Sequence, residues 1–277
     1  MPLQLSNAAI MQFKVDFELK YQAAEKLSLC SNNLFGLRGD SYQLPYMGEV
    51  TTHSRGAYQS MIPASDLEVT KKSILFSNFT ANLPLDYFQN MELSAATNTL
   101  ASLSDVHSKS MARRSDQFLI DAWVADSGLQ IADGGTNMTV DKLKEAKSYL
   151  DTNNVPMEDR YLVCTPSQID SLLSDQSVTS ILFNQQRTLV NGQIDTFLGF
   201  KVITLGNMPE GGLPVANEIR SCFAFSKSST YRGYQISPSV DVQWAPSWQS
   251  WLTISRLRAG AVVGQTNGVV EISCDES

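Results

Sequence analysis

Residues 94–123 read SAATNTLASLSDVHSKSMARRSDQFLIDAW and contain neither proline nor glycine. Apolar side chains return along this stretch at close to the 3.6-residue period of an α-helix: Leu100, Leu103, Val106, Met111, Phe118, Leu119, Ala122 and Trp123. The pattern predicts one helix of about thirty residues, whereas helices in globular proteins average about 11 to 12 residues. A helix of this length indicates a structural beam against which other elements pack.

Upstream of this helix, the sequence predicts a helical segment followed by an extended arm. Residues 6–27 carry an amphipathic helical pattern, with Ser6 as a candidate cap. Between residues 35 and 86 the helical period is weak, and two extended runs cover 42–52 and 67–83. These runs predict a long two-stranded arm. An isolated two-stranded ribbon is marginally stable at best, so the arm must lie on its own subunit or on a neighbour.

Downstream, residues 126–135 predict a loop and a domain boundary, and an alternating α and β region follows. Thr139 caps a predicted helix from Val140, and Thr165 caps a second one with Pro166 in its first turn and Gln168 at the capping-box position. Asn-Gly at 191–192 predicts a tight hairpin. Strands are expected at 160–164, 200–205, 221–225, 239–244, 250–257, 260–263 and 269–274. The expected fold class is α+β.

Composition limits the possible functions. The chain has 277 residues, 43% of them hydrophobic, but only 18% are charged, compared with roughly 25% in soluble domains. Two interpretations stay open: a surface hidden against other proteins, because interface cores are depleted in charge, or a surface rich in neutral polar residues. The net charge of −7 excludes a basic face that grips nucleic acid.

The sequence also predicts a chain that stays away from membranes and from oxidising compartments. No apolar run approaches the roughly 18 residues of a membrane span, and the first residues, MPLQLSN, lack the pattern of a signal peptide. The four scattered cysteines, Cys30, Cys164, Cys222 and Cys274, are expected to be buried free thiols. We therefore expect a cytosol-like compartment and no membrane partner.

Candidate catalytic residues are few and scattered. His53 and His107 are the only histidines, and neither has a close companion of the kind that metal or nucleophilic sites need. Carboxylates at Asp121, Asp126 and 158–159 are candidates for an acid pair only because acids are common. Phosphate-binding, dinucleotide-binding and nucleophile-elbow motifs are missing from the sequence. We expect no catalytic, cofactor-binding or metal site, and therefore a structural protein that is not an enzyme.

Four segments, taken in order, resemble the major capsid proteins of tailed double-stranded DNA bacteriophages, which have the Hong Kong 97-like fold. They are MARRSDQFLID at 111–121, VPMEDRYLVCTPSQ at 155–168, LVNGQIDTFLGF at 189–200, and AGAVVG at 259–264 followed by GVVEI at 268–272. Each is a packing or turn motif of moderate specificity, but together they span most of the chain. The resemblance favours the hidden-surface interpretation of the low charge.

The resemblance implies a domain layout. The N-terminal arm would cover 1–35 and an extended E-loop 40–82. A peripheral domain with a long spine helix would hold 83–126 and 237–258, and an axial domain would hold 127–236 and 259–277.

The resemblance also implies partners and a location. Subunits would form pentamers and hexamers in an icosahedral shell, with scaffolding, portal and decoration proteins as partners and packaged double-stranded DNA as a non-specific neighbour. Assembly would take place in the host cytoplasm and the shell would be part of the virion. The N-terminal helix begins at Ser6, which leaves no room for a cleaved scaffolding segment and implies a separate scaffolding protein or a mature chain. Lys71 and Lys72 lie in the arm, but no cross-linking partner for them is identified.

Two alternatives stay open at this stage. An encapsulin-like cellular nanocompartment has the same fold but encloses cargo enzymes. A cytosolic enzyme with its site in residues 130–235 would need a cleft that places Asp159 or Asp175 beside a second acid.

Overall fold

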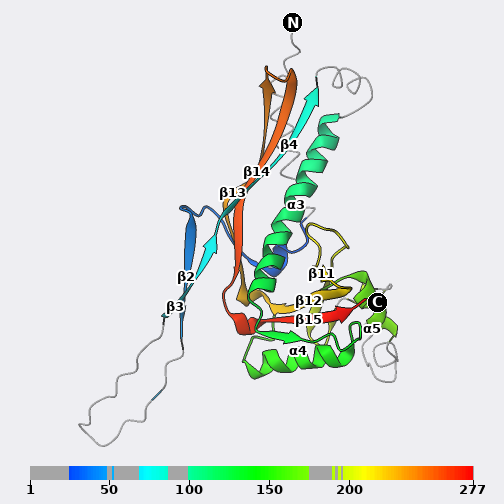
Figure 1. The fold of residues 1–277 in the computed structure, drawn as a ribbon. Helices are drawn as coiled ribbons and strands as arrows, with labels where there is room; N and C mark the ends of the chain where they lie inside the picture. Colours follow the sequence, from blue (N-terminus) through cyan, green and yellow to red (C-terminus); the bar gives the residue numbers. More distant parts are fainter. Residues whose placement is uncertain are drawn as a thin grey trace, which may run out of the picture.

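The computed structural model describes residues 25–48, 52, 69–86, 99–174, 189–190, 193–194 and 196–276. The predicted long helix is confirmed as α3, Thr99–Ala125, while residues 94–98 lie outside the described part. Figure 1 shows α3 running alongside three long strands, β4, β13 and β14, and ending next to a second sheet. The helix therefore spans the length of one sheet and reaches the other.

The long sheet has the order β1-β13-β14-β4. Its strands are β1 (Asn32–Leu34), β13 (Thr230–Ala245), β14 (Ser250–Val263) and β4 (Ser77–Asp86). The prediction of two separate strands at 250–257 and 260–263 is wrong, because β14 continues through Gly260 as a single strand. A Cβ there would lie 2.0 Å from the carbonyl oxygen of Leu75, so glycine lets another strand cross closely without ending β14.

An apolar contact attaches α3 to this sheet. Met111, Ala112 and Phe118 of the helix pack against Tyr234, Val240, Leu257 and Ala259 of β13 and β14. The guanidinium of Arg114 lies 3.7 Å from the ring centre of Phe79 on β4, which adds a cation–π contact at the sheet edge.

The second sheet has the order β5-β15-β12-β6-β10-β9, with β11 on the edge of β12. Its strands are β5 (Leu129–Ile131), β15 (Val269–Asp275), β12 (Ile219–Ser226), β6 (Arg160–Cys164), β10 (Phe200–Thr204), β9 (Thr196–Phe197) and β11 (Val215–Ala216). The loop expected at 126–135 is wrong in part, because Leu129–Ile131 form strand β5. This strand is hydrogen-bonded to β15, at the other end of the chain, so the local sequence does not predict it.

Two helices and the larger core complete this part. The helices are α4 (Val140–Thr152) and α5 (Pro166–Ser174); the predicted Thr139 cap is confirmed at α4, and the capping-box role of Gln168 is confirmed at α5. The Thr139 side chain accepts a hydrogen bond from the Lys142 amide, and the Gln168 side chain accepts one from the Thr165 amide. Trp123 of α3 is fully buried against Phe223 and Phe225, so α3 shares the core of this sheet too.

Several smaller expectations also have an outcome. Strands β7 (Leu189–Val190) and β8 (Gln193–Ile194) pair, as the Asn-Gly signal predicts. All four cysteines are buried free thiols, as expected.

Most of the expected helix 6–27 lies outside the described residues. Residues 25–27 are not helical and lead into a 3-10 turn, η1 (Ser28–Cys30), because their amides bond to a side chain of α3 instead. Further 3-10 turns are η2 (Lys227–Ser229) and η3 (Thr266–Gly268).

The two-stranded arm exists, but it is shorter than expected. Strands β2 (Ser41–Met47) and β3 (Val69–Leu75) pair antiparallel, from Ser41 opposite Leu75 to Met47 opposite Val69. The run 67–83, expected to be one strand of the arm, divides at Phe76, and its second half becomes β4 of the long sheet. The second half of this run pairs with the better-buried strand β14. The alternation of apolar and polar residues in the sequence does not reveal this pairing. We call β2 and β3 the ribbon.

The base of the ribbon packs on its own subunit. Ile74 is fully buried, and Lys72 forms an ion pair with Asp126 beyond the end of α3. Asp40, just before β2, pairs with Arg258 of β14 at 2.7 Å. Near the other end, the ring of Tyr46 contacts Tyr231 of β13, with the ring centres 6.2 Å apart, whereas Met47 and Val69 are exposed. Support for the ribbon therefore comes partly from the subunit itself.

Replacing Ile74 with alanine should destabilise the folded subunit by about 2–5 kcal/mol, because the change leaves a cavity between the ribbon and the long sheet. The matched control is Val69→Ala at the exposed end of β3, which should change the free energy of unfolding by less than about 0.5 kcal/mol. Urea unfolding of both variants measures the difference. Equal stabilities would mean that the base of the ribbon is not docked.

Candidate functional site

A buried polar junction joins the N-terminal segment, α3 and the long sheet. At its centre is Arg232 of β13, whose side chain is fully buried. Its guanidinium donates to Glu25 and to Asn33 in the N-terminal segment, and to Ser115 of α3 at 2.8 Å. The Tyr234 hydroxyl lies within hydrogen-bond distance of both Ser115 and Glu25. One side chain therefore fixes three elements that are far apart in the sequence.

Asp116 of α3 holds the same N-terminal segment through its backbone. The carboxylate accepts hydrogen bonds from the amides of Lys26 and Leu27, both at 3.3 Å. It lies 3.9 Å from Arg232. Two carboxylates, Glu25 and Asp116, thus share one guanidinium in a buried setting, and one negative charge is left over.

The excess negative charge raises the proton affinity of Asp116. Burial first, and the neighbouring Glu25 carboxylate second, raise the pKa of Asp116 to about 6, against the opposing effects of Arg232 and the two amides. A carboxyl group with such a pKa takes up a proton under mildly acidic conditions. This raised value belongs to a structural junction, because no second catalytic group converges on it from the described residues.

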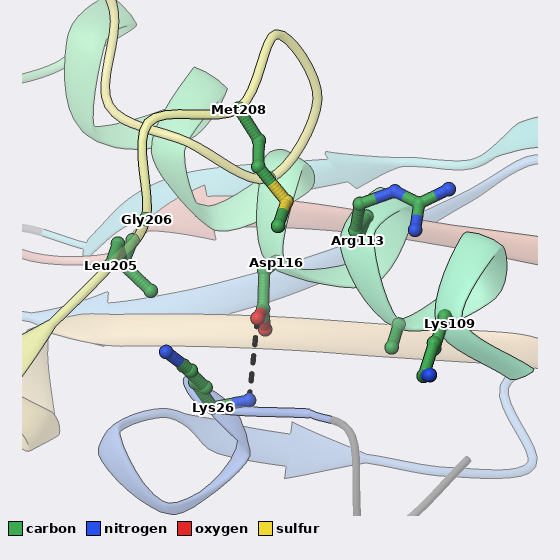
Figure 2. Close-up of a pocket in the computed structure, with 9 residues that line it drawn as sticks. Lys26, Lys109, Arg113, Asp116, Leu205, Gly206 and Met208 are labelled. Carbon is green, nitrogen blue, oxygen red and sulfur yellow. Dashed lines mark hydrogen bonds between the residues drawn. The ribbon is translucent and has the colours of Figure 1, made fainter.

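A pocket opens beside Asp116, between α3, Lys26 and the loop that follows β10. Its volume is about 270 Å³. Figure 2 shows Met208 reaching from the loop toward Asp116, with Lys26 on one side and Lys109 and Arg113 of α3 on another. Gly211 lets this loop lie directly on the helix backbone at Arg113, with φ at +76°. The pocket therefore combines three cations and the Asp116 carboxylate with an apolar wall.

Exposed apolar side chains mark other parts of the surface. On the ribbon, Met47 is 76% exposed, and Val69 and Leu75 are exposed too. Trp248 is exposed at the turn between β13 and β14, next to the paired rings of Trp244 and Trp251. Large apolar groups at the tips of projecting elements are typical of protein–protein contacts.

The sequence-derived candidates for chemistry do not come together. Asp126 pairs with Lys72, and Asp159 pairs with Lys201. Asp121 accepts a hydrogen bond from Gln117 on the same helix. His53 and Asp175 lie outside the described residues. These acids therefore serve separate local contacts, and the acid pair that an enzyme in residues 130–235 would need is not formed by Asp159.

His107 and the cysteines occupy structural positions. His107 is buried on α3, where its Nδ1 lies 2.9 Å from the Ser255 hydroxyl, and burial lowers its pKa. Burial raises the pKa of the Cys30 and Cys164 thiols to about 12, so both stay protonated and are weak nucleophiles. Within the described ranges, no group of three or more His, Cys, Asp or Glu side chains is arranged to hold a metal ion.

The junction residues Glu25, Ser115, Asp116 and Arg232 were not among the sites expected from the sequence. Glu25 and Arg232 are 207 positions apart, so no local spacing connects them. The one available signal was an arginine between two tyrosines, Tyr231 and Tyr234, which requires a counter-charge if it is buried.

The ribbon, the spine-like helix α3 and the two sheets define a capsid subunit of the Hong Kong 97-like fold. Residues 5–276 match the family model described as phage capsid protein. The chain therefore belongs to the phage capsid protein family, and it is a shell-forming major capsid protein of the virion. A comparison with curated proteins found no match.

Solved structures agree on the fold. The head structure of Helicobacter pylori bacteriophage KHP40 matches with a TM-score of 0.72 and 10% identity, over 92% of this chain and 91% of that one. A structure from Mycobacterium phage Che8 matches with a TM-score of 0.65 and 18% identity, over 85% of each chain. A virus-like particle from Pyrococcus furiosus also matches, with a TM-score of 0.63 and 9% identity, over 95% and 98%.

The fold alone therefore does not separate phage shells from other shells. The match to the phage capsid family does so, and the encapsulin-like alternative is not favoured. Across the described residues, none of the helices has the length and apolar character needed to span a membrane.

The pKa of Asp116 predicts how stability depends on pH. Between its ordinary pKa of 3.8 and about 6, the folded state binds this proton and the unfolded state releases it. The contribution of Asp116 to stability is therefore highest below pH 4 and falls by about 3 kcal/mol as pH rises to 7. Asp116→Asn removes this dependence, and losing one amide acceptor only adds a constant offset. Urea unfolding of the unassembled subunit from pH 4 to 7.5 should show wild-type and variant curves that diverge, whereas parallel curves would contradict the assignment.

Proposed function

We propose that many copies of this chain assemble into a closed icosahedral shell of pentamers and hexamers around double-stranded DNA. The observation that carries the proposal is the ribbon. Its base is docked on its own subunit, but Met47 and Val69, at its outer end, are exposed and lie beyond that docking contact. A neighbouring subunit supplies the missing cover. Many modest contacts of this kind act together through multivalency.

We propose a domain layout that follows sheet membership. The long sheet and α3 form the peripheral domain, and the second sheet with α4 and α5 forms the axial domain. This layout retains an N-terminal arm at 1–35 and an E-loop at 40–82, except that β1 (Asn32–Leu34) and β4 from Ser77 onward belong to the long sheet. Because β13 begins at Thr230, the border expected at 236 and 237 moves to about 229 and 230, and the border at 258 and 259 moves to about 263 and 264.

We also propose that the subunit acts through assembly and not through catalysis. Among the described candidates, Asp121, Asp126 and Asp159 lie apart and are occupied in local contacts, which supports this view. DNA is a non-specific neighbour, since the net charge of −7 avoids a salt-sensitive grip on phosphates. Assembly takes place in the host cytoplasm, with scaffolding and portal proteins and a decoration protein as partners.

Electron microscopy of the purified chain, alone and together with the other virion proteins, tests the central proposal. The expected result is closed isometric particles. A strict monomer under all conditions would defeat the proposal.

A shortened ribbon tests the role of the E-loop. Met47 and Val69 lie opposite each other, so an Asn-Gly turn can replace residues 48–68 and close the hairpin without changing its register. The variant should unfold like the wild type, because Ile74 and Lys72 keep the base of the ribbon docked, but it should form no shells. Thermal unfolding and electron microscopy give the two readouts. Shells of normal yield would show that the outer ribbon is dispensable.

A further inference from the structure

The pocket beside α3 is lined by more cations than anions, with Lys26, Lys109 and Arg113 against the single carboxylate of Asp116. Six arginines form ion pairs with carboxylates: Arg114, Arg160, Arg220, Arg232, Arg256 and Arg258. Arg113, on the rim of the pocket, forms none with any residue that the structure describes. Lys26 and Lys109 lie near it, and the apolar wall includes Met208, which is 53% exposed.

The size of the pocket favours side chains as its occupants. A volume of about 270 Å³ lies just below the roughly 300–1,000 Å³ that is usual for small-molecule sites. Its chemistry calls for a carboxylate next to an apolar side chain. Since the net charge of the chain is −7, another copy of the chain can supply such a pair.

One turn of the same chain presents this pair outward. Between α4 and β6, Met157 is 69% exposed and Glu158 is exposed as well. Among the described side chains, none forms an ion pair with Glu158. Arg160 holds the turn from below: its guanidinium donates to the carbonyl oxygens of Val155 and Pro156 and to the Asp151 carboxylate. The turn is therefore a rigid projection with an acid and a methionine at its tip.

The turn and the pocket lie at opposite ends of the second sheet. Strands β6 and β10 are parallel, with Tyr161 opposite Lys201 and Cys164 opposite Thr204. The turn precedes the first residue of β6, whereas the pocket residue Leu205 follows the last residue of β10. The two surfaces therefore cannot meet within one subunit. Different surfaces at opposite ends give a heterologous contact, which closes into a ring when the rotation between successive copies closes.

We propose that the pocket of one subunit receives Met157 and Glu158 of the next subunit around a ring. The Glu158 carboxylate pairs with Arg113, and Met157 packs on Met208. This contact rests on the proposed function, because it requires copies arranged in rings. The two surfaces of this contact, the pocket and the turn at 155–159, are separate from the ribbon.

Charge reversal tests the pairing. Arg113→Glu and Glu158→Arg should each lower the yield of shells by about tenfold or more, because each places like charges in contact in every copy. The double variant restores opposite charges and should recover most of the yield. Both single variants should unfold like the wild type, because Glu158 is exposed and the half-buried Arg113 forms no ion pair with a described residue. Failure of the double variant to recover would overturn the pairing.

A second reversal provides the matched control. Glu218 is also exposed and lies near the exposed Val215, so it offers similar chemistry elsewhere on the surface. Glu218→Arg should not rescue Arg113→Glu. Rescue by Glu218→Arg in place of Glu158→Arg would assign the pocket to a different acid and overturn the proposal.

Cross-linking gives a readout that does not depend on yield. All four native cysteines are buried, so Met157→Cys and Met208→Cys introduce the accessible thiols. Shells of the double variant, treated with a short bis-maleimide, should give a ladder up to pentamers and hexamers on a denaturing gel. Each single variant should remain monomeric on the gel. A monomeric double variant from intact shells would refute the contact. Absence of shells from the wild-type chain would instead count against the proposed function.

Discussion

The burial of Arg232 is the constraint on which the arrangement of the subunit depends. A guanidinium keeps its charge at any physiological pH, so a fully buried one must be surrounded by acceptors. None of the ion-pair and hydrogen-bond partners found for its guanidinium belongs to its own strand. Glu25 and Asn33 come from the N-terminal segment, and Ser115 and Asp116 come from α3. The requirement to neutralise one cation thus brings three distant elements together.

The junction fixes where the N-terminal segment lies on α3 more than it adds to the stability of the fold. Two carboxylates around one guanidinium leave a negative charge in a buried place, and the raised pKa of Asp116 records its cost. Buried ion pairs often contribute little net stability, whereas removing one partner costs about 3–5 kcal/mol. The junction therefore penalises any other position of the N-terminal segment on α3. Because the pocket opens beside Asp116, the same helix surface fixes the segment on one side and presents Arg113 on the other.

Elements with local signals could be predicted from the sequence, and elements held by distant partners could not. Helix α3 and the caps at Thr139 and Thr165 rest on periodicity and on hydrogen bonds within a few residues. Strand β5 exists because β15 pairs with it, and the run 67–83 divides because β14 offers a partner to its second half. The resemblance to phage capsid proteins supplied the overall architecture, whereas the junction around Arg232 depended on contacts across the whole chain.

The low content of charged residues takes on a sharper meaning in the folded subunit. Only 18% of residues are charged, and several of these charges are directed inward: Arg160, Arg220 and Arg232 are buried, and Lys142 donates to three carbonyl oxygens. The surface is therefore poorer in charge than the composition suggests. At the same time, the ribbon, the turn at 155–159 and the loop after β10 each expose a methionine. A surface short of charge with apolar groups on its projections is costly for an isolated subunit and suits one whose projections are covered by its neighbours.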